Sequence, residues 1–201
     1  MKILLLLIIL TFSTNSFSES SDNFQNNAVG FEITKPSSWH YMTAEENLKN
    51  FEKIELDDEN FKNLVLKYSS TPLVVMVKHD PTFGDINPSI KVNTRPMAEF
   101  QDIGPKEILN ILIPQFSNVF SDFEMVQEPS DTEISSINAA YTRFNYTIAS
   151  ADGKSFPITS ELWIVPREHH YYMIGAGTRQ DERTGTREEI SEVVNTIKIT
   201  K

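Results

Sequence analysis

Apolar and polar residues alternate most regularly in the second half of the chain. Between residues 141 and 150, every second side chain falls on one face of an extended strand, and these are Thr142, Phe144, Tyr146 and Ile148. A turn follows over residues 151–153, where Gly153 can adopt the left-handed conformation. A three-residue loop there pairs Ile148 with Phe156, whereas a two-residue loop would turn Phe156 to the wrong face. We therefore predict a hairpin with the three-residue loop.

The same register places Tyr141 opposite Trp163 on the second face of this hairpin. Both faces of the two strands then carry aromatic surface. Because large aromatic side chains are seldom left in water over a whole sheet face, we expect both faces to be at least partly covered.

Shorter apolar runs predict further strands and helices. The strands are expected over 29–34, 72–78, 89–94 and 171–178, and a further short segment is expected to open at Asp57 or Asp58. Three helices are predicted from capping boxes, a leading proline and apolar stripes: one from Thr43 to about Phe51, one opened by Pro105, and one opened by Thr186. Pro114 is expected to bend or divide the second. The stripe of the last helix comprises Ile190, Val193, Val194 and Ile197.

These elements define a fold class. About six to eight strands and three or four helices, with short turns between consecutive strands, predict one α+β domain with a central antiparallel sheet flanked by helices. A chain of 201 residues suits one or two domains. With no internal repeat and no linker after residue 28, we predict a single domain over residues 28–201.

The first residues are typical of an export signal. Lys2 precedes an unbroken Ile and Leu run over residues 3–10, which is far shorter than the roughly 20 apolar residues of a membrane-spanning helix. We predict a signal peptide over 1–18 with cleavage after Ser18, then a flexible lead-in over 19–27. An uncleaved N-terminal anchor is the alternative. No integral membrane segment is expected after cleavage, and no cysteine is present for a lipid anchor.

Composition narrows the function. Removing residues 1–18 leaves 17 basic and 28 acidic residues, a balance of −11. Nucleic acid and anionic membranes would repel such a chain, so nucleic-acid binding is disfavoured. The absence of cysteine from all 201 residues removes thiol catalysis, redox exchange and cysteine-based zinc sites.

Catalytic motifs are not found. The sequence has no Gly-x-Ser-x-Gly elbow, no Ser-x-x-Lys pair and no His-Glu-x-x-His helix, and its candidate bases are His40, His79, His169 and His170. We predict no catalytic residue, no cofactor and no metal ligand.

Three weaker alternatives stay open. His79, Asp80 and Asp85 could together ligate a metal ion, although a polar strand end explains them as well. His169 and His170 would point to opposite faces of a strand and cannot easily chelate one ion. Residues 39–41, Trp-His-Tyr, could form a recognition cluster, or Trp39 could close the edge of the core.

The order of these segments resembles the PsbP-like superfamily and its bacterial DcrB-like periplasmic branch. The resemblance rests on residues 31–39 (Phe-Glu-Ile-Thr-Lys-Pro-Ser-Ser-Trp), the Pro105-led helix, the Asp152-Gly153 hairpin, residues 161–163 and 171–174, and a C-terminal helix over 188–199. It implies an antiparallel sheet between helices in a family of mostly non-enzymatic accessory proteins, with no family active-site residues to transfer.

Our leading hypothesis is therefore an exported, non-catalytic accessory protein of the cell envelope, periplasmic or secreted, that binds a protein partner. The alternative is a small-molecule or metal-binding module that uses Trp39, His40, His79 and Asp85. A hydrolase ranks third, because it would need a Ser or Thr beside a histidine in a pocket.

Overall fold

The computed structural model describes residues 21–52, 54–55, 72–80, 82–100, 102–150 and 153–200. The predicted signal peptide, its cleavage at Ser18 and the segment expected to open at Asp57 or Asp58 lie outside these ranges. The helices are α1 (Ala44–Glu52), the short 3-10 helix η1 (Met97–Glu99), α3 (Pro105–Ser117) and α4 (Arg187–Val194). The strands are β1 (Asn23–Asn26), β2 (Phe31–Thr34), β3 (His40–Tyr41), β4 (Ile54–Glu55), β5 (Val74–Val77), β6 (Ser89–Pro96), β7 (Ser121–Ile134), β8 (Ile137–Ser150), β9 (Ser155–Pro166), β10 (His170–Arg179) and β11 (Lys198–Ile199).

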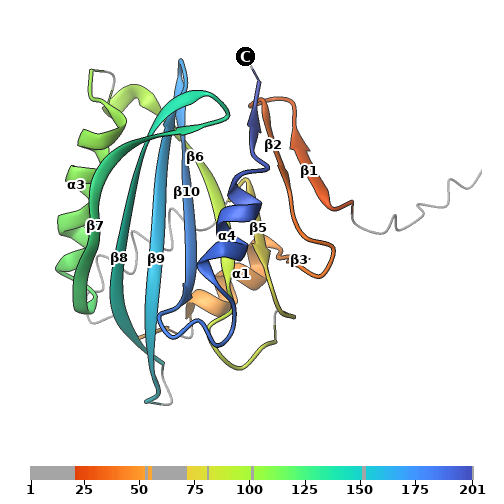
Figure 1. Ribbon diagram of the computed structural model, residues 1–201, viewed down its shortest axis with the longest axis vertical. Coiled ribbons are helices and arrows are strands. Elements are labelled where there is room, and N and C mark those ends of the chain that lie inside the picture. The colour runs from red at the N-terminus through yellow and green to blue at the C-terminus, as the bar shows by residue number, and fades with distance from the viewer. Residues whose placement is uncertain are drawn as a thin grey trace, which may run out of the picture.

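The strands form two antiparallel sheets (Figure 1). The large sheet has the order β3-β5-β6-β10-β9-β8, and both β7 and β4 pair with the outer edge of β8. The small sheet has the order β1-β2-β11. With helices packed on this architecture, the predicted α+β class is confirmed. No helix among the described residues has the length and apolarity needed to cross a membrane.

Each face of the large sheet has its own core. On one face, α4 and the small sheet cover a cluster that includes Trp163, Tyr172, Ile174 and Ile190. On the other, α3 covers a smaller cluster built on Ile108, Leu109, Leu162 and Ile164. Because side chains alternate along a strand, neighbours such as Leu162 and Trp163 serve opposite clusters. The large sheet is thus a central layer between two coverings.

The register of the β8–β9 hairpin is as predicted. Ile148 pairs with Phe156, and Gly153 has a left-handed φ of 78°. Tyr141 lies opposite Trp163, with ring centroids 5.0 Å apart. The predicted capping box of the last helix is also present, since the Thr186 side chain accepts from the Glu189 backbone and the Glu189 carboxylate accepts from the Thr186 backbone. At these positions the local sequence rules for hairpin loops and helix caps predicted the structure correctly.

The structure differs from the sequence expectation at its two ends. Part of the expected flexible lead-in forms β1, because Asn23 to Asn26 pair with β2. The last helix stops at Val194, and Lys198 and Ile199 pair with β2 as β11 instead of extending a helix to residue 199. Ile197 still reaches the core, at 4% exposure, through the turn that follows Asn195. A run of β-branched residues after Asn195 favours a strand over a further helical turn.

Two features lie in the middle of the chain. Pro114 does not divide α3, which runs as one helix from Pro105 to Ser117. The proline stands near the C-terminal end, where it removes one hydrogen bond from the last turns. The sequence analysis also does not predict β7, a 14-residue strand that joins β8 through a tight turn at Ser135 and Ser136, both left-handed.

Candidate functional site

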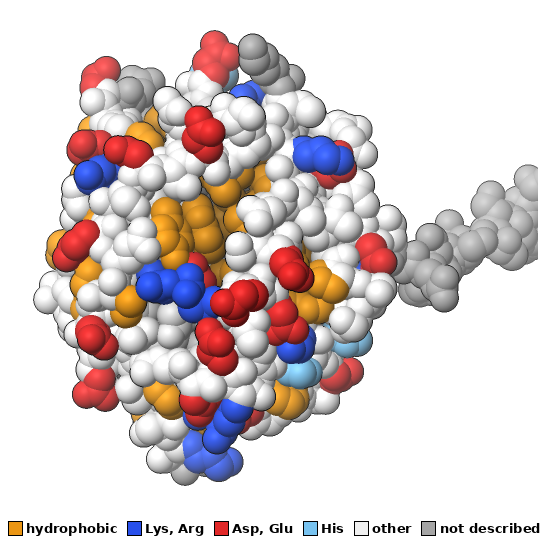
Figure 2. Space-filling model, viewed as in Figure 1, with side chains coloured by type: hydrophobic (Ala, Val, Ile, Leu, Met, Phe, Trp, Pro, Cys, Tyr) orange, Lys and Arg blue, Asp and Glu red, His pale blue; other side chains and the backbone are white. Residues whose placement is uncertain are grey.

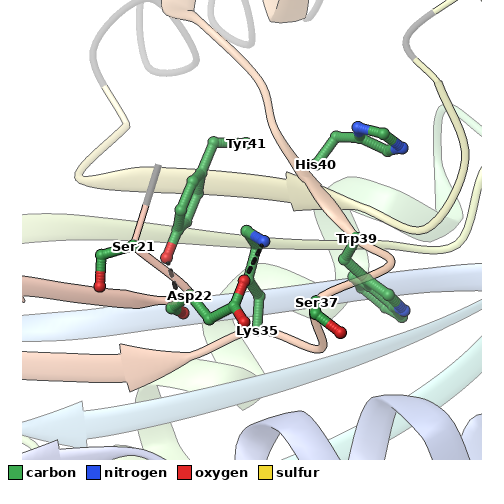
Figure 3. Close-up of a pocket in the computed structure, with 7 residues that line it drawn as sticks. All are labelled: Ser21, Asp22, Lys35, Ser37, Trp39, His40 and Tyr41. Atoms are coloured by element: carbon green, nitrogen blue, oxygen red, sulfur yellow. Dashed lines mark hydrogen bonds and ion pairs between the residues drawn. The ribbon is translucent and has the colours of Figure 1, made fainter. Parts of the chain in front are cut away.

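A pocket of about 730 Å³ lies beside the start of β1 and the segment from β2 to β3 (Figure 3). The residues that line it are Ser21, Asp22, Lys35, Ser37, Trp39, His40 and Tyr41. Pro36 ends β2 and turns the chain, because a proline cannot continue the hydrogen-bond ladder. That turn brings Lys35 and Tyr41 to the same side as Asp22.

The charged groups of this pocket already satisfy one another. Lys35, with 4% of its side chain exposed, places Nζ 2.7 Å from Asp22 Oδ1 and 5.3 Å from the centre of the Tyr41 ring. The Tyr41 hydroxyl donates to the Asp22 carbonyl at 3.0 Å. Burial, reinforced by the nearby Asp22 carboxylate, raises the pKa of Tyr41. An anion that entered the pocket would have to displace Asp22 from Lys35. The ion pair links the start of β1 to the end of β2, and we assign it a structural role.

The predicted recognition cluster at residues 39–41 is divided by the fold. Trp39 is only 3% exposed and belongs to the main core cluster. His40 is exposed on β3, whose backbone pairs with Val77 of β5, and its ring points away from the Lys35–Asp22 pair (Figure 3). Trp39 therefore closes the edge of the core, and His40 and Tyr41 remain as the accessible members.

His79 and Asp85 lie elsewhere, near the loop that precedes α4. His79 Nε2 is 2.7 Å from the Thr184 carbonyl oxygen, and its ring packs on Phe83 with centroids 4.3 Å apart. Asp85 accepts from Arg179 at 2.7 Å and from Arg183 at 2.7 Å. Burial works to raise the pKa of Asp85, but hydrogen bonds from Arg183, its neighbouring backbone and Arg179 outweigh burial and lower that pKa. The two arginines occupy the carboxylate that a metal ion would need.

His169 and His170 stand where β10 begins. His169 is exposed, with Nε2 3.9 Å from the Glu168 carboxylate. His170 packs edge-on against Tyr172, with ring centroids 4.9 Å apart, and burial, with Arg167 and His169 nearby, lowers its pKa. Among the residues that the structure describes, no group of three or more His, Cys, Asp or Glu is placed to hold a metal ion. The four residues of the small-molecule alternative are therefore split between the pocket, the core and the β5–β6 loop.

A second concave region lies on the α4 side of the large sheet. Figure 2 shows hydrophobic side chains on the floor of a hollow between α4 and the β7–β8 hairpin. On this face β8 carries Ile137, Ala139 and Tyr141; Ala139 is buried, and Tyr141 lies opposite the buried Trp163 of β9. Ile137 and Tyr141 are half-buried and pack against the main core from its edge. We call this region, with Arg143 and Arg187 on the same face, the α4-side hollow.

A polar network fixes one end of the hollow. Glu161, 7% exposed, accepts from Arg187 Nε at 3.0 Å through Oε1, and its Oε2 accepts from the Tyr141 hydroxyl and from Arg187 Nη2 at 3.4 Å. Burial and the hydrogen bond to Glu161 raise the pKa of Tyr141 to about 12. Tyr141 is therefore a neutral donor at physiological pH, and the network ties the start of α4 to the sheet.

Arg143 stands beside this network without joining it. It pairs across the strands with Glu161, so both side chains are on the α4 side of the sheet. Within the described residues no hydrogen bond or ion pair engages its guanidinium. Strand alternation from Tyr141, which the sequence places opposite Trp163, puts Arg143 on this face as well, but it does not reveal a hollow. Strand alternation was enough to predict which face Arg143 occupies. It could not predict how much of that face α4 covers.

Chemically, the α4-side hollow offers an apolar aromatic floor and a cationic border. Glu161, the Tyr141 hydroxyl and Arg187 are committed to one another by hydrogen bonds. The Lys35 pocket is polar and internally paired by comparison.

Comparison with known proteins gives structural neighbours only. No protein-family model matches the sequence, and no curated protein sequence matches it significantly. Among solved structures, LpqN of Mycobacterium tuberculosis, described as involved in cell envelope biogenesis, has a TM-score of 0.51 and 13% identity over 85% of this chain and 83% of its own. This likeness shows a shared fold.

Two further structures match less closely. A protein from Bacteroides thetaiotaomicron VPI-5482 has a TM-score of 0.47 and 14% identity over 90% of this chain, which spans about half (49%) of that protein. The cyanobacterial PsbP (CyanoP) of Synechocystis sp. PCC 6803 has a TM-score of 0.49 and 13% identity over 94% of this chain and 98% of its own. A PsbP protein is thus among the solved structures that match the chain.

Proposed function

We propose that this chain is an exported, non-catalytic accessory protein of the cell envelope, and that it binds a protein partner through the α4-side hollow. The observation that carries the proposal is the apolar floor of the hollow, left uncovered by α4 on a face otherwise edged by polar side chains (Figure 2). Exposed apolar surface with a polar rim is typical of interaction sites on proteins that are otherwise well packed.

The composition of the hollow supports a protein partner. Tyr and Arg are among the residue types that most often dominate protein–protein binding energies, and the half-buried Tyr141 and Arg143 lie on this one face. The hollow is open toward solvent, whereas small-molecule sites enclose most of their ligand (Figure 2). The envelope location is supported by the predicted signal peptide over residues 1–18 and by the fold shared with LpqN.

The test is photocrosslinking in intact cells of the source organism. A benzoylphenylalanine replaces Thr132, which lies opposite Ala139 on the hollow side of β7, and in a matched control it replaces the exposed Gln115 of α3 on the other side of the sheet. We expect a discrete protein adduct from position 132 only, and its loss when Ile137→Asp is added. Equal adducts from both positions, or none from position 132, would contradict the proposal.

Export has a separate test. The protein is recovered from fractionated cells, and its N-terminus is sequenced. A mature chain that begins at Glu19, or within a few residues of it, in the extracytoplasmic fraction is expected from the predicted cleavage after Ser18. Recovery with Met1 or Lys2 at the N-terminus would instead support the uncleaved anchor.

A second candidate function is small-molecule binding in the Lys35 pocket. Its volume of about 730 Å³ is in the range of ligand sites, and His40 and Tyr41 line it beside the Lys35–Asp22 pair. Binding to the native state must raise the melting temperature. We would therefore melt the protein with saturating divalent metals, amino acids and sugars, and repeat any shift with His40→Ala. No shift with any of them would exclude this function for these ligand classes.

A further inference from the structure

Arg143 is a charged residue of the α4-side hollow whose cross-strand partner, Glu161, is already bonded to other side chains. Opposite charges facing each other across a strand pair ordinarily form an ion pair. Here Glu161, the residue opposite Arg143, has both carboxylate oxygens engaged by Arg187 and Tyr141. Arg187 approaches Glu161 from α4. Arg143 is thereby left with a free guanidinium among the described residues.

The other neighbours of Arg143 on this face do not replace that partner. Gln127, opposite Arg143 on β7, donates to the Ser130 hydroxyl at 3.1 Å. Glu124, which lies on the same face of β7, accepts from the Asn145 amide at 3.4 Å and is not among the ion-pair partners of Arg143 within the described residues. A guanidinium in this setting has its fork of donors available for a planar acceptor.

The apolar floor and the guanidinium together specify a ligand with two kinds of group. The half-buried side chains of Ile137 and Tyr141 favour bulky apolar side chains, because their burial removes apolar surface from water. The guanidinium of Arg143 favours a carboxylate, which it can bind through two parallel hydrogen bonds. Aspartate, glutamate and a chain terminus are the sources of carboxylate in a protein partner. An acidic chain of net charge −10 would repel such a group unless a local cation offset the repulsion.

We infer that the partner docks a peptide segment in which apolar side chains lie beside a carboxylate, and that Arg143 is the residue that selects this carboxylate. The inference rests on the proposed function and names the chemistry of the partner. The openness of the hollow favours a peptide over the acyl chain of a lipid, which would leave much of its length in water (Figure 2).

The experiment uses the mature chain, residues 19–201, and a display library of random dodecapeptides as the probe. Peptides retained by the wild type are expected to combine aromatic or branched apolar residues with Asp or Glu. For the strongest of them, binding of a fluorescent synthetic copy is compared with that of its Asp→Asn or Glu→Gln form by fluorescence polarisation. We expect the wild type to prefer the acidic form by about tenfold, the usual contribution of one charge-assisted hydrogen-bonded pair.

Substitutions then assign the preference to Arg143. Arg143→Gln should bind the acidic and amide forms equally, and Arg143→Glu should select Lys or Arg in place of acidic residues when the library is panned again. Lys106→Gln is the matched control, because it makes the same charge change in α3 on the other face of the sheet and should keep the tenfold preference. Unchanged melting temperatures show that each variant is folded.

The outcomes separate the inference from the function beneath it. Peptides that lose binding with Ile137→Asp but show no preference for acid would overturn the role of Arg143 and leave the docking function standing. No selected peptide, or peptides indifferent to Ile137→Asp, would overturn both. Binding of dodecanoate at the hollow, seen as chemical-shift changes at Tyr141 and Trp163 without any peptide binding, would also overturn both, because the occupant would be a lipid.

Discussion

The two faces of the β8–β9 hairpin differ in how completely they are covered. On the α3 side, the rings of Phe116, Phe120, Phe123, Phe144 and Tyr146 form one stack, with neighbouring centroids between 4.1 and 6.2 Å apart. On the α4 side, Tyr141 and Trp163 form a single pair 5.0 Å apart, and the surface beside them is hollow (Figure 2). The same strands thus present one sealed face and one that is partly open.

Helix length explains much of this difference. The 13 residues of α3 span about 20 Å, whereas the eight of α4 span about 12 Å. The 14 residues of β8 extend over about 45 Å. A short helix that is also tied down at Arg187 leaves part of the strand face uncovered. Burial of aromatic surface stabilises a fold, so the α4 side of the hairpin is the less completely packed of its two faces.

The largest effect is expected from truncation of the sealed face. Ile108→Ala removes a side chain that is 0% exposed from the cluster under α3, and the lost burial and the cavity together should cost about 3 kcal/mol of unfolding free energy. The matched control is Ile111→Ala in the same helix, where the side chain is 44% exposed and the cost should be below about 0.5 kcal/mol. Urea denaturation of both variants measures the difference. Similar losses would show that α3 does not seal this face.

Sequence patterns predicted the hairpin better than its surroundings. The register of β8 and β9 follows from strict alternation and from Gly153, because a one-residue slip would invert every side chain. By contrast β7 carries five acidic residues and Pro129 among its 14 positions, and this composition hides its alternation. β7 forms a strand because it pairs with β8. This pairing is a tertiary effect, and the local sequence pattern does not predict it.

The candidate site was less predictable than the fold. Trp39 and His40 are adjacent in sequence, yet one is in the core and the other in solvent. The hollow depends on where α4 ends, and the apolar stripe through Ile197 suggested a longer helix than the one observed. Whether Arg143 is paired depends on Arg187, 44 residues later in the sequence. Charge pairing across such distances follows from the packed structure alone.

The second largest effect on unfolding free energy is expected at the Glu161–Arg187 ion pair, which links α4 to the large sheet. Arg187→Gln leaves the buried Glu161 carboxylate with the Tyr141 hydroxyl as its remaining partner and should cost about 2 kcal/mol. Lys49→Gln, which breaks the exposed pair between Lys49 and Glu45 on α1, is the control and should cost less than about 0.5 kcal/mol. Thermal and urea unfolding measure both. Equal costs would mean that the network does not anchor α4.

A third prediction concerns Lys91, a half-buried lysine on the α3 side of β6. Burial, with Arg95 nearby, lowers the pKa of Lys91 to about 8. Because the unfolded chain keeps this proton up to about pH 10.4, unfolding free energy should rise as pH increases from 8 to 10. Lys91→Met removes the charge and should stabilise the protein by about 1 kcal/mol at pH 7, with the gain vanishing near pH 10. Urea denaturation of wild type and variant across this range tests it, and a gain independent of pH would contradict the assigned cause.

The smallest effect on stability is expected on the α4 side of the β8–β9 hairpin. This substitution also tests most directly whether the two faces of the hairpin differ. Ile137 is half-buried at the edge of the main core, so Ile137→Ser should cost less than about 1 kcal/mol while it weakens binding of the selected peptides by tenfold or more. Val126→Ser on β7, where Val126 is 41% exposed, is the control and should leave binding unchanged. Fluorescence polarisation and urea denaturation measure the two quantities on the same samples. If Ile137→Ser destabilised the protein by several kcal/mol, or left binding intact, the open face would belong to the packed core and would not be the docking surface.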